Sequence, residues 1–315
     1  MVNNLIFWGV RGSFPIASPD LIKYGGNTSC ISLQIDEDTI IVFDAGSGLK
    51  NLGDTMARQY KNKLPEIHIL ISHFMWDHIM GIPFFRPLYK NRGRINIYSA
   101  YREDHFSLKE IFAVQHSRDY FHVDFIELPA VLNFYSIKAY HPFRIKNAII
   151  TPVVLNHADI TYGYIVDFKG QRIAYVCDTA PFHTQFLGTL PNPKFNEMKY
   201  LNYIREKLFD ELFRADIVYF DAHFTYDEYK DKHHWGHATP DYALKVCQEC
   251  EVYNLFLGHH APEHNDEKMD EIVKITQEKN QDQYLKVFGA REKMTVKISS
   301  SEEKQQDNMK QQVNG

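Results

Sequence analysis

Short runs of apolar residues, many of them β-branched or aromatic, recur along the first hundred residues and predict strands. These runs are bounded by glycine, asparagine and aspartate, which favour turns. The predicted strands lie at 4–10, within 30–44, at 67–72 and at 95–99. Between them, the segments near 48–60 and over 79–90 carry patterns that predict helices.

The remainder of the chain, from about residue 149, repeats this alternation of apolar strands and amphipathic helices. Strands are predicted at 149–155, 162–167, 172–176, 217–220, 254–257 and 284–288, and helices at 199–214, 240–250 and 266–279. In both halves strands are followed by helices, and polar residues follow the strands. This pattern predicts a layered α/β protein with the sheets inside and the helices outside.

Two segments depart from the pattern. Residues 101–135 are aromatic and less regular, which predicts a lid or an inserted subdomain. Their rings could form a stacking wall for a nucleobase, or they could simply be the core of that subdomain. From Ser299 the chain is polar and rich in glutamine, lysine and glutamate, which predicts a disordered tail. We therefore expect one domain over 1–298 and a tail over 299–315.

Composition and charge narrow the class of protein. The 315 residues are 44% hydrophobic and 24% charged, and no apolar run approaches the roughly 20 residues that cross a bilayer. We expect no membrane partner and no secretion signal. Four cysteines are too few for a disulfide scaffold, which predicts a reducing cytoplasm. A net charge of −5 argues against extended nucleic acid as a partner, while a local basic pocket stays open.

Histidine and aspartate residues follow several of the predicted strands directly. The segment from Ser72 to Gly81 follows a buried strand and contains His73, Asp77 and His78. Three later apolar runs lead to such residues, at His157, at Asp178 and at the pair His259 and His260. Imidazole nitrogen and carboxylate oxygen are good ligands for zinc, manganese and iron. The alternative for the first segment alone is a pair of surface histidines and a helix-capping aspartate, but the ordered set predicts a metal site.

This set resembles the metallo-β-lactamase superfamily, whose motif is H-x-H-x-D-H followed by single His, Asp and His ligands. Gly9-Val10-Arg11-Gly12-Ser13 and Tyr24-Gly25-Gly26-Asn27 also resemble its branch of ribonuclease Z-like and cyclic-nucleotide phosphodiesterases. The resemblance implies a four-layer αββα sandwich and one or two divalent ions per chain, Zn²⁺ first and Mn²⁺ or Fe²⁺ as alternatives. Homodimers are common in this superfamily, so the resemblance leaves a homodimer open beside a monomer.

The same resemblance implies a ligand set. His73 and His157 would hold the first metal, Asp77, His78 and His259 the second, and Asp178 would bridge both. His260 is the rival of its neighbour His259.

One residue departs from the motif, because Met75 stands where its second histidine would be. A thioether is a soft, neutral group and a poor ligand for zinc, manganese or magnesium. The first metal would then keep only His73, His157 and the bridging Asp178. The second metal retains four candidate ligands, so occupancy by a single ion is an open alternative.

Two residues are candidates for catalysis, and three for contact with a substrate. Asp77 would orient or deprotonate the metal-bound water. His237, in a loop like the histidine loop of phosphodiesterase members, would neutralise the phosphate or protonate the leaving oxygen; the alternative is a helix-capping loop. Arg11, Asn27 and His260 are weaker candidates for substrate binding, and for Arg11 a structural salt bridge is an equal alternative.

The leading hypothesis is therefore a metal-dependent hydrolase, a phosphodiesterase for a small phosphodiester such as a cyclic nucleotide. A second hypothesis keeps the fold but not the catalysis, giving a metal-binding or ligand-sensing protein impaired by Met75. A third is a thioester or lactone hydrolase, which would share the metals but would not need His237.

Overall fold

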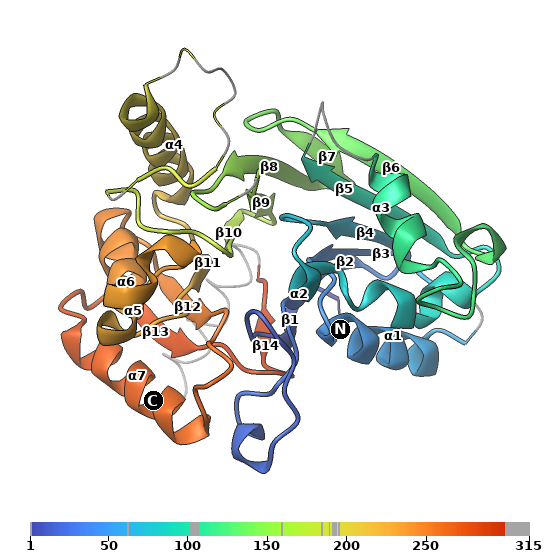
Figure 1. The fold of residues 1–315 in the computed structure, drawn as a ribbon, viewed down its shortest axis with the longest axis horizontal. Coiled ribbons are helices and arrows are strands. Elements are labelled where there is room, and N and C mark those ends of the chain that lie inside the picture. The colour runs from blue at the N-terminus through green and yellow to red at the C-terminus, as the bar shows by residue number, and fades with distance from the viewer. Residues whose placement is uncertain are drawn as a thin grey trace, which may run out of the picture.

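The structure is a computed structural model, and it describes residues 2–61, 63–100, 107–158, 160–183, 185–188, 190, 194 and 196–299. These residues form two seven-stranded sheets that face each other (Figure 1). The first sheet has the order β14 (Thr295–Lys297), β1 (Asn4–Gly9), β2 (Cys30–Asp36), β3 (Thr39–Phe43), β4 (Glu66–Leu70), β5 (Arg94–Ala100) and β6 (Val131–Ile137). The second has the order β13 (Lys286–Gly289), β12 (Asn254–Gly258), β11 (Ile217–Asp221), β10 (Gln171–Val176), β9 (Tyr162–Phe168), β8 (Ala148–Val154) and β7 (Phe143–Ile145).

Helices cover the outer face of each sheet. The first sheet carries α1 (Gly48–Gln59) and α3 (Leu108–Gln115), and the second carries α4 (Glu197–Leu212), α6 (Pro240–Glu249) and α7 (Asp266–Lys279) (Figure 1). The short helices α2 (Trp76–Ile79) and α5 (Tyr226–Lys232) follow β4 and β11 along the chain. Short 3₁₀ turns lie at Pro19–Leu21, Ile82–Phe84, Arg86–Tyr89, Phe125–Glu127 and His233–Trp235. The predicted four-layer αββα sandwich is confirmed. None of the helices in the described ranges is long and apolar enough to cross a membrane.

The main core lies between the two sheets and is rich in aromatic rings. Phe7 of the first sheet lies 5.4 Å from Phe256 of the second, measured between ring centroids. Phe43 stacks on Tyr175 across the same interface at 5.3 Å. Because aromatic side chains bury large apolar areas, these contacts hold the sheets face to face. The packed sheets therefore support the side chains that lie at their common edge.

Parallel strands bring the polar strand ends to that edge. β3, β4, β5 and β6 are parallel neighbours in the first sheet, and β10, β11, β12 and β13 in the second. The residues that follow three of these strands, Asp44, Asp178 and His259, have positive φ angles of 55°, 59° and 53°. A left-handed backbone is unfavourable for residues with a side chain, and such strain gathers at functional sites.

The structure corrects the predicted helix over 79–90. That segment contains the end of α2 and two separate 3₁₀ turns instead of one helix. Pro83 and Pro87 each occupy the start of a turn, and proline within a continuous helix would remove a backbone hydrogen bond. The alternation of apolar residues was real, but the prolines break the chain into single turns.

The predicted lid over 101–135 also takes a different form where the structure describes it. Residues 107–135 supply α3 and most of β6, which pairs in parallel with β5. Phe112 of α3 stacks on Phe134 of β6 at 5.9 Å, so the aromatic residues build the outer layer of the first sheet. Residues 101–106, and residues 300–315 of the predicted tail, lie outside the described part of the chain.

Candidate metal centre

The six residues predicted as metal ligands come together at the common edge of the sheets, and all are buried. His73, Asp77 and His78 follow β4 on the first sheet. His157, Asp178 and His259 follow β8, β10 and β12 on the second. β8, β10 and β12 run in the same direction within the second sheet, so the residues that follow them reach one edge, where they meet those that follow β4.

Asp178 lies at the centre of the cluster and directs its two carboxylate oxygens to different partners. Its Oδ2 is 3.7 Å from Nε2 of His73 and 3.7 Å from Nε2 of His157. Its Oδ1 is 3.2 Å from Nε2 of His78 and 3.1 Å from Nε2 of His259. The carboxylate therefore divides the cluster into an Oδ2 side and an Oδ1 side. Each side gathers nitrogen and oxygen atoms that could hold a metal ion.

Asp77 belongs to the Oδ1 side. Its Oδ2 lies 3.2 Å from Nε2 of His78 and 3.4 Å from Nε2 of His259. Burial alone would raise the pKa of this carboxyl, but the charge of His78 and the hydrogen bond from His259 lower the pKa below its ordinary value. Asp77 is therefore a carboxylate, the form that binds a cation.

Met75 belongs to the Oδ2 side, where the resemblance places a histidine. Its Sδ lies 3.5 Å from Nε2 of His157. The thioether thus occupies the place next to His157 without offering a nitrogen or oxygen. Two imidazoles and one carboxylate oxygen remain on this side, which agrees with the weak first position predicted from the sequence.

The ring orientation of the histidines leaves Nε2 facing the cluster. Nδ1 of His157 donates to the carbonyl of Gly236 at 2.9 Å, and Nδ1 of His78 is 2.7 Å from Oδ2 of Asp44. A histidine that binds a metal commonly donates its other ring N–H to a carbonyl or a carboxylate, which fixes the tautomer. Gly236 has a φ of 91°, and a Cβ at this position would lie 2.2 Å from Nδ1 of His157. Only glycine lets the loop approach the ring this closely.

Asp44 was not among the predicted residues, yet it supports the centre. This buried carboxylate accepts hydrogen bonds from the Ser72 backbone N–H at 2.7 Å, the Ser72 hydroxyl at 2.8 Å and the Tyr175 hydroxyl at 2.7 Å, besides its contact with His78. With Asp178 and Asp77 it raises the pKa of His78 well above the ordinary value, against the opposing effect of burial. The signal was available in the sequence, since Asp44 also follows an apolar run directly.

His237, predicted as a catalytic residue, lies beside the cluster and is held by Asp221. Its Nδ1 is 3.0 Å from Oδ2 of Asp221 and 4.0 Å from Oδ2 of Asp178. Burial lowers the pKa of His237, but Asp221 outweighs this effect and raises it. The capping alternative holds as well, because Thr239 caps α6 by accepting a hydrogen bond from the Tyr242 backbone N–H.

Arg11 is not available to a substrate, which corrects the weak prediction made for it. Its side chain is fully buried, and the guanidinium donates to the carbonyls of Gly25, Ala261 and His264. The turn that contains it contributes to the site in another way. The Ser13 backbone N–H donates to Oδ2 of Asp77 at 2.8 Å, and a Cβ at Gly12 would lie 2.5 Å from Cε1 of His259.

Asn27 and His260 are likewise occupied by structural contacts. The Asn27 amide donates to both carboxylate oxygens of Glu292 at 3.0 and 3.1 Å and accepts from the Ser47 hydroxyl. Nε2 of His260 donates to the Ala290 carbonyl at 2.8 Å, and burial and the charge of Arg11 lower its pKa to about 3. Of the two adjacent histidines, His259 is therefore the one that faces Asp77 and Asp178.

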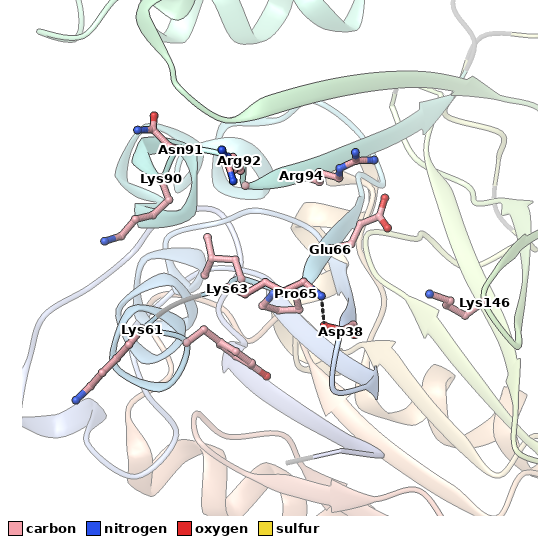
Figure 2. A pocket seen from close by; sticks show the side chains of 13 residues that line it. Asp38, Lys61, Lys63, Pro65, Glu66, Lys90, Asn91, Arg92, Arg94 and Lys146 are labelled. Atoms are coloured by element: carbon pink, nitrogen blue, oxygen red, sulfur yellow. Dashed lines mark hydrogen bonds and ion pairs between the residues drawn. The ribbon is translucent and has the colours of Figure 1, made fainter.

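A separate hollow of about 580 Å³ lies at the amino ends of β4 and β5, away from the metal cluster. Figure 2 shows Glu66 and Arg94 at these strand starts, with Asp38 and Lys63 hydrogen-bonded nearby. Most of its charged lining residues are basic: Lys61, Lys63, Lys90, Arg92, Arg94 and Lys146. This is the local basic region that the overall charge left open, and it contains none of the predicted site residues.

Comparisons with known proteins agree with this architecture. Residues 39–195 match the family described as the beta-lactamase superfamily domain. A comparison with curated protein sequences finds no match.

Solved structures are similar over nearly the whole chain. The metallo-β-lactamase fold protein YhfI from Bacillus subtilis has a TM-score of 0.63 and 15% identity, covering 93% of this chain and 99% of that protein. The short form of human tRNase Z has a TM-score of 0.60 and 18% identity, with coverages of 94% and 99%. Unliganded yeast PDE1 has a TM-score of 0.60 and 12% identity, with coverages of 95% and 100%. At these identities the likeness shows the fold alone.

Proposed function

The chain belongs to the metallo-β-lactamase superfamily of metal-dependent hydrolases, and we propose that it is a phosphodiesterase for a small phosphodiester such as a cyclic nucleotide. The observation that carries this proposal is the division of Asp178 between two sets of imidazole nitrogens, with His237 adjacent. His73, Asp77, His78, His157, Asp178 and His259 would hold the metal, with Zn²⁺ expected first and Mn²⁺ or Fe²⁺ as alternatives.

Each residue has a role that follows from its contacts. A divalent ion lowers the pKa of bound water and polarises a phosphoryl oxygen, so it supplies a nucleophile near neutral pH. Asp77 lies between His78 and His259 and would orient that water. His237 stands beside Asp178 with its Nδ1 held by Asp221, so its Nε2 is the atom to place against the phosphate or the leaving oxygen.

The proposed substrate class rests on the net charge of the protein and on its fold. A net charge of −5 does not favour a long polyanion, which would need an extended basic surface. The fold is shared with yeast PDE1 and human tRNase Z. The cysteines in the described residues are free and buried, which supports a reducing compartment, and we propose the cytoplasm.

The proposal is tested by hydrolysis of bis-p-nitrophenyl phosphate and of cyclic nucleotides. The metal-free protein is loaded with Zn²⁺, Mn²⁺ or Fe²⁺ and assayed beside a chelated control. We expect turnover that depends on the added metal, and absence of turnover with every divalent metal contradicts the proposal. His237→Ala is then compared on a phosphodiester and a thioester, since loss on the phosphodiester alone excludes the thioester or lactone hydrolase.

Met75 favours a second candidate function, a metal-binding or ligand-sensing protein without efficient catalysis. Its sulfur faces His157 at 3.5 Å where a further nitrogen ligand would complete the Oδ2 side. A protein of this kind would bind one ion tightly but hydrolyse none of the substrates above. The two candidates separate in the same assay, because metal binding without turnover supports the second.

A further inference from the structure

His223 is a buried histidine beside the metal cluster that the proposed ligand set does not use. It follows β11, whose last residue is Asp221. Its Nδ1 donates to the carbonyl of His259 at 2.7 Å, and its backbone N–H donates to Oδ1 of Asp221 at 3.1 Å. The ring is therefore fixed by the His259 carbonyl, and the backbone that carries it by Asp221.

The imidazole of His223 completes a closed ring of neighbouring imidazoles around Asp178 and Asp77. The centroids of neighbouring imidazoles in this circle are 4.3 to 5.5 Å apart. The order is His73, His157, His237, His223, His259, His78 and back to His73. Within this ring, His223 and His237 stack at 4.4 Å with 23° between their planes.

The hydrogen bonds of this stacked pair leave the same nitrogen free on both rings. Nδ1 of His223 is engaged by the His259 carbonyl and Nδ1 of His237 by the Asp221 carboxylate. A carbonyl accepts only a donor, so the neutral His223 ring carries its proton on Nδ1 and a lone pair on Nε2. This is the arrangement found for His157 on Gly236, and it is typical of histidines that bind a metal through the remaining nitrogen.

The ligand atoms of this region are close enough to share one ion. One nitrogen each from His223, His237 and His259 lies within 4.8 Å of the other two. Oxygen atoms of Asp178 and Asp221 form a second such group with His237 and His259. A Cβ at Gly12 would lie 2.8 Å from Cε1 of His223, so glycine there leaves the ring its place.

We propose that His223, with His237 and Nδ1 of His259, forms a divalent-metal position that is separate from the one bounded by His73 and His157. Nε2 of His259 faces Asp77 and Asp178, whereas its Nδ1 is buried without a hydrogen-bond partner among the described residues. The chain would then hold its second ion here, because Met75 deprives the Oδ2 side of a ligand while His223 adds one beside the Oδ1 side. This inference rests on the proposed function and changes it in one respect: with its Nε2 on the ion, His237 would act on the phosphate through that ion instead of contacting it directly. The ligand is a borderline cation that prefers nitrogen, such as Zn²⁺ or Co²⁺.

The test compares the full-length protein with His223→Asn. The asparagine amide nitrogen can replace Nδ1 as the donor to the His259 carbonyl, while the variant lacks any atom in place of Nε2. Metal-free protein is dialysed against Co²⁺, and the bound metal is counted by mass spectrometry and followed by visible absorption. We expect about two ions per chain in the wild type and about one in His223→Asn, with affinity for the second ion lowered at least about a hundredfold.

Two further variants make the outcome decisive. His183→Asn, outside the ring of imidazoles, is the matched control and should keep the wild-type stoichiometry and spectrum. Met75→His added to His223→Asn should recover a second ion, now with a different Co²⁺ spectrum. Wild-type stoichiometry and absorption in His223→Asn overturn the inference, as does a wild type that never binds a second ion. Hydrolysis of bis-p-nitrophenyl phosphate is scored separately, so the proposed function can fail while this metal position stands, and the reverse.

Discussion

The two sides of Asp178 are built from the same residue types but are equipped differently. On the Oδ1 side, His78 and His259 are joined by a second carboxylate, Asp77, and all three side chains are buried. On the Oδ2 side, His73 and His157 are joined by the thioether of Met75, which is 40% exposed. The Oδ1 side thus has two carboxylates, Asp77 and Asp178. The Oδ2 side has only Asp178, which it shares with the Oδ1 side.

The support behind the two sides differs as well. His78 rests on Asp44, a buried carboxylate that is itself held by three other donors. Within the described residues, Nδ1 of His73 has one hydrogen-bonding partner, the Ser72 hydroxyl at 3.0 Å, and burial lowers the pKa of His73 well below the ordinary value. A charged partner behind the ring raises the basicity of a histidine ligand. We therefore expect an ion on the Oδ1 side to stay bound under conditions that remove an ion from the Oδ2 side.

The largest expected effect comes from removing one histidine from each side in turn, which tests whether the two sides bind metal differently. His78→Ala should abolish tight metal binding and lower turnover by more than about a hundredfold, because a first ligand and the contact with Asp44 are both lost. His73→Ala should leave the tightly bound ion in place. Metal content after dialysis and initial hydrolysis rates measure both effects. Equal losses in the two variants would show that the sides are not independent.

A smaller change tests the support behind His78 alone. In Asp44→Asn the amide group would face a donor, since each Asp44 oxygen accepts hydrogen bonds in the wild type. We expect metal affinity on the Oδ1 side to fall about 10- to 100-fold, the range seen for such outer partners. Titration with a competing chelator measures it. The matched control is Asp210→Asn on the exposed face of α4, which should change nothing.

The smallest expected effect is a gain. Met75→His should add a nitrogen ligand beside His157, raise metal binding on the Oδ2 side and increase turnover by about tenfold, or about 1.4 kcal/mol in the barrier. Met75→Leu, which is similarly apolar but lacks the sulfur, is the control and should resemble the wild type. If the histidine variant binds no more metal and turns over no faster, residue 75 is not the missing ligand.

Where an apolar run ended directly in a charged or imidazole side chain, the sequence predicted which side chains would meet at the edge of the sheets. His157, Asp178 and His259 are reached by this reasoning because strand direction decides where their side chains meet. Asp44 and Asp221 carry the same signal but were passed over, since they lie behind histidines and their role depends on which ring they face. His223 carried a weaker signal, because it comes after Asp221 and Ala222 rather than at the strand end.

Other features depend on long-range packing that a sequence pattern does not contain. Arg11 was a candidate for phosphate contact because a tight turn can present a side chain outward. Its guanidinium instead turns inward to the carbonyls of Ala261 and His264, about 250 positions away. The segment around Phe112 predicted a lid or an inserted subdomain because it is aromatic and less regular than its surroundings. The partner is β6 of the same segment, which forms the edge of the first sheet.

The ligands are drawn from both sheets, and this has a mechanical consequence. Asp77 on the first sheet and His259 on the second are separated by 182 positions in the chain. An ion gripped by both is a cross-link across the sandwich, comparable to a disulfide that closes a very long loop and is worth about 5 kcal/mol in the chain-entropy account. The cation would then stabilise the packing of the two sheets against each other. Its removal would weaken the contact between the sheets before either sheet unfolded.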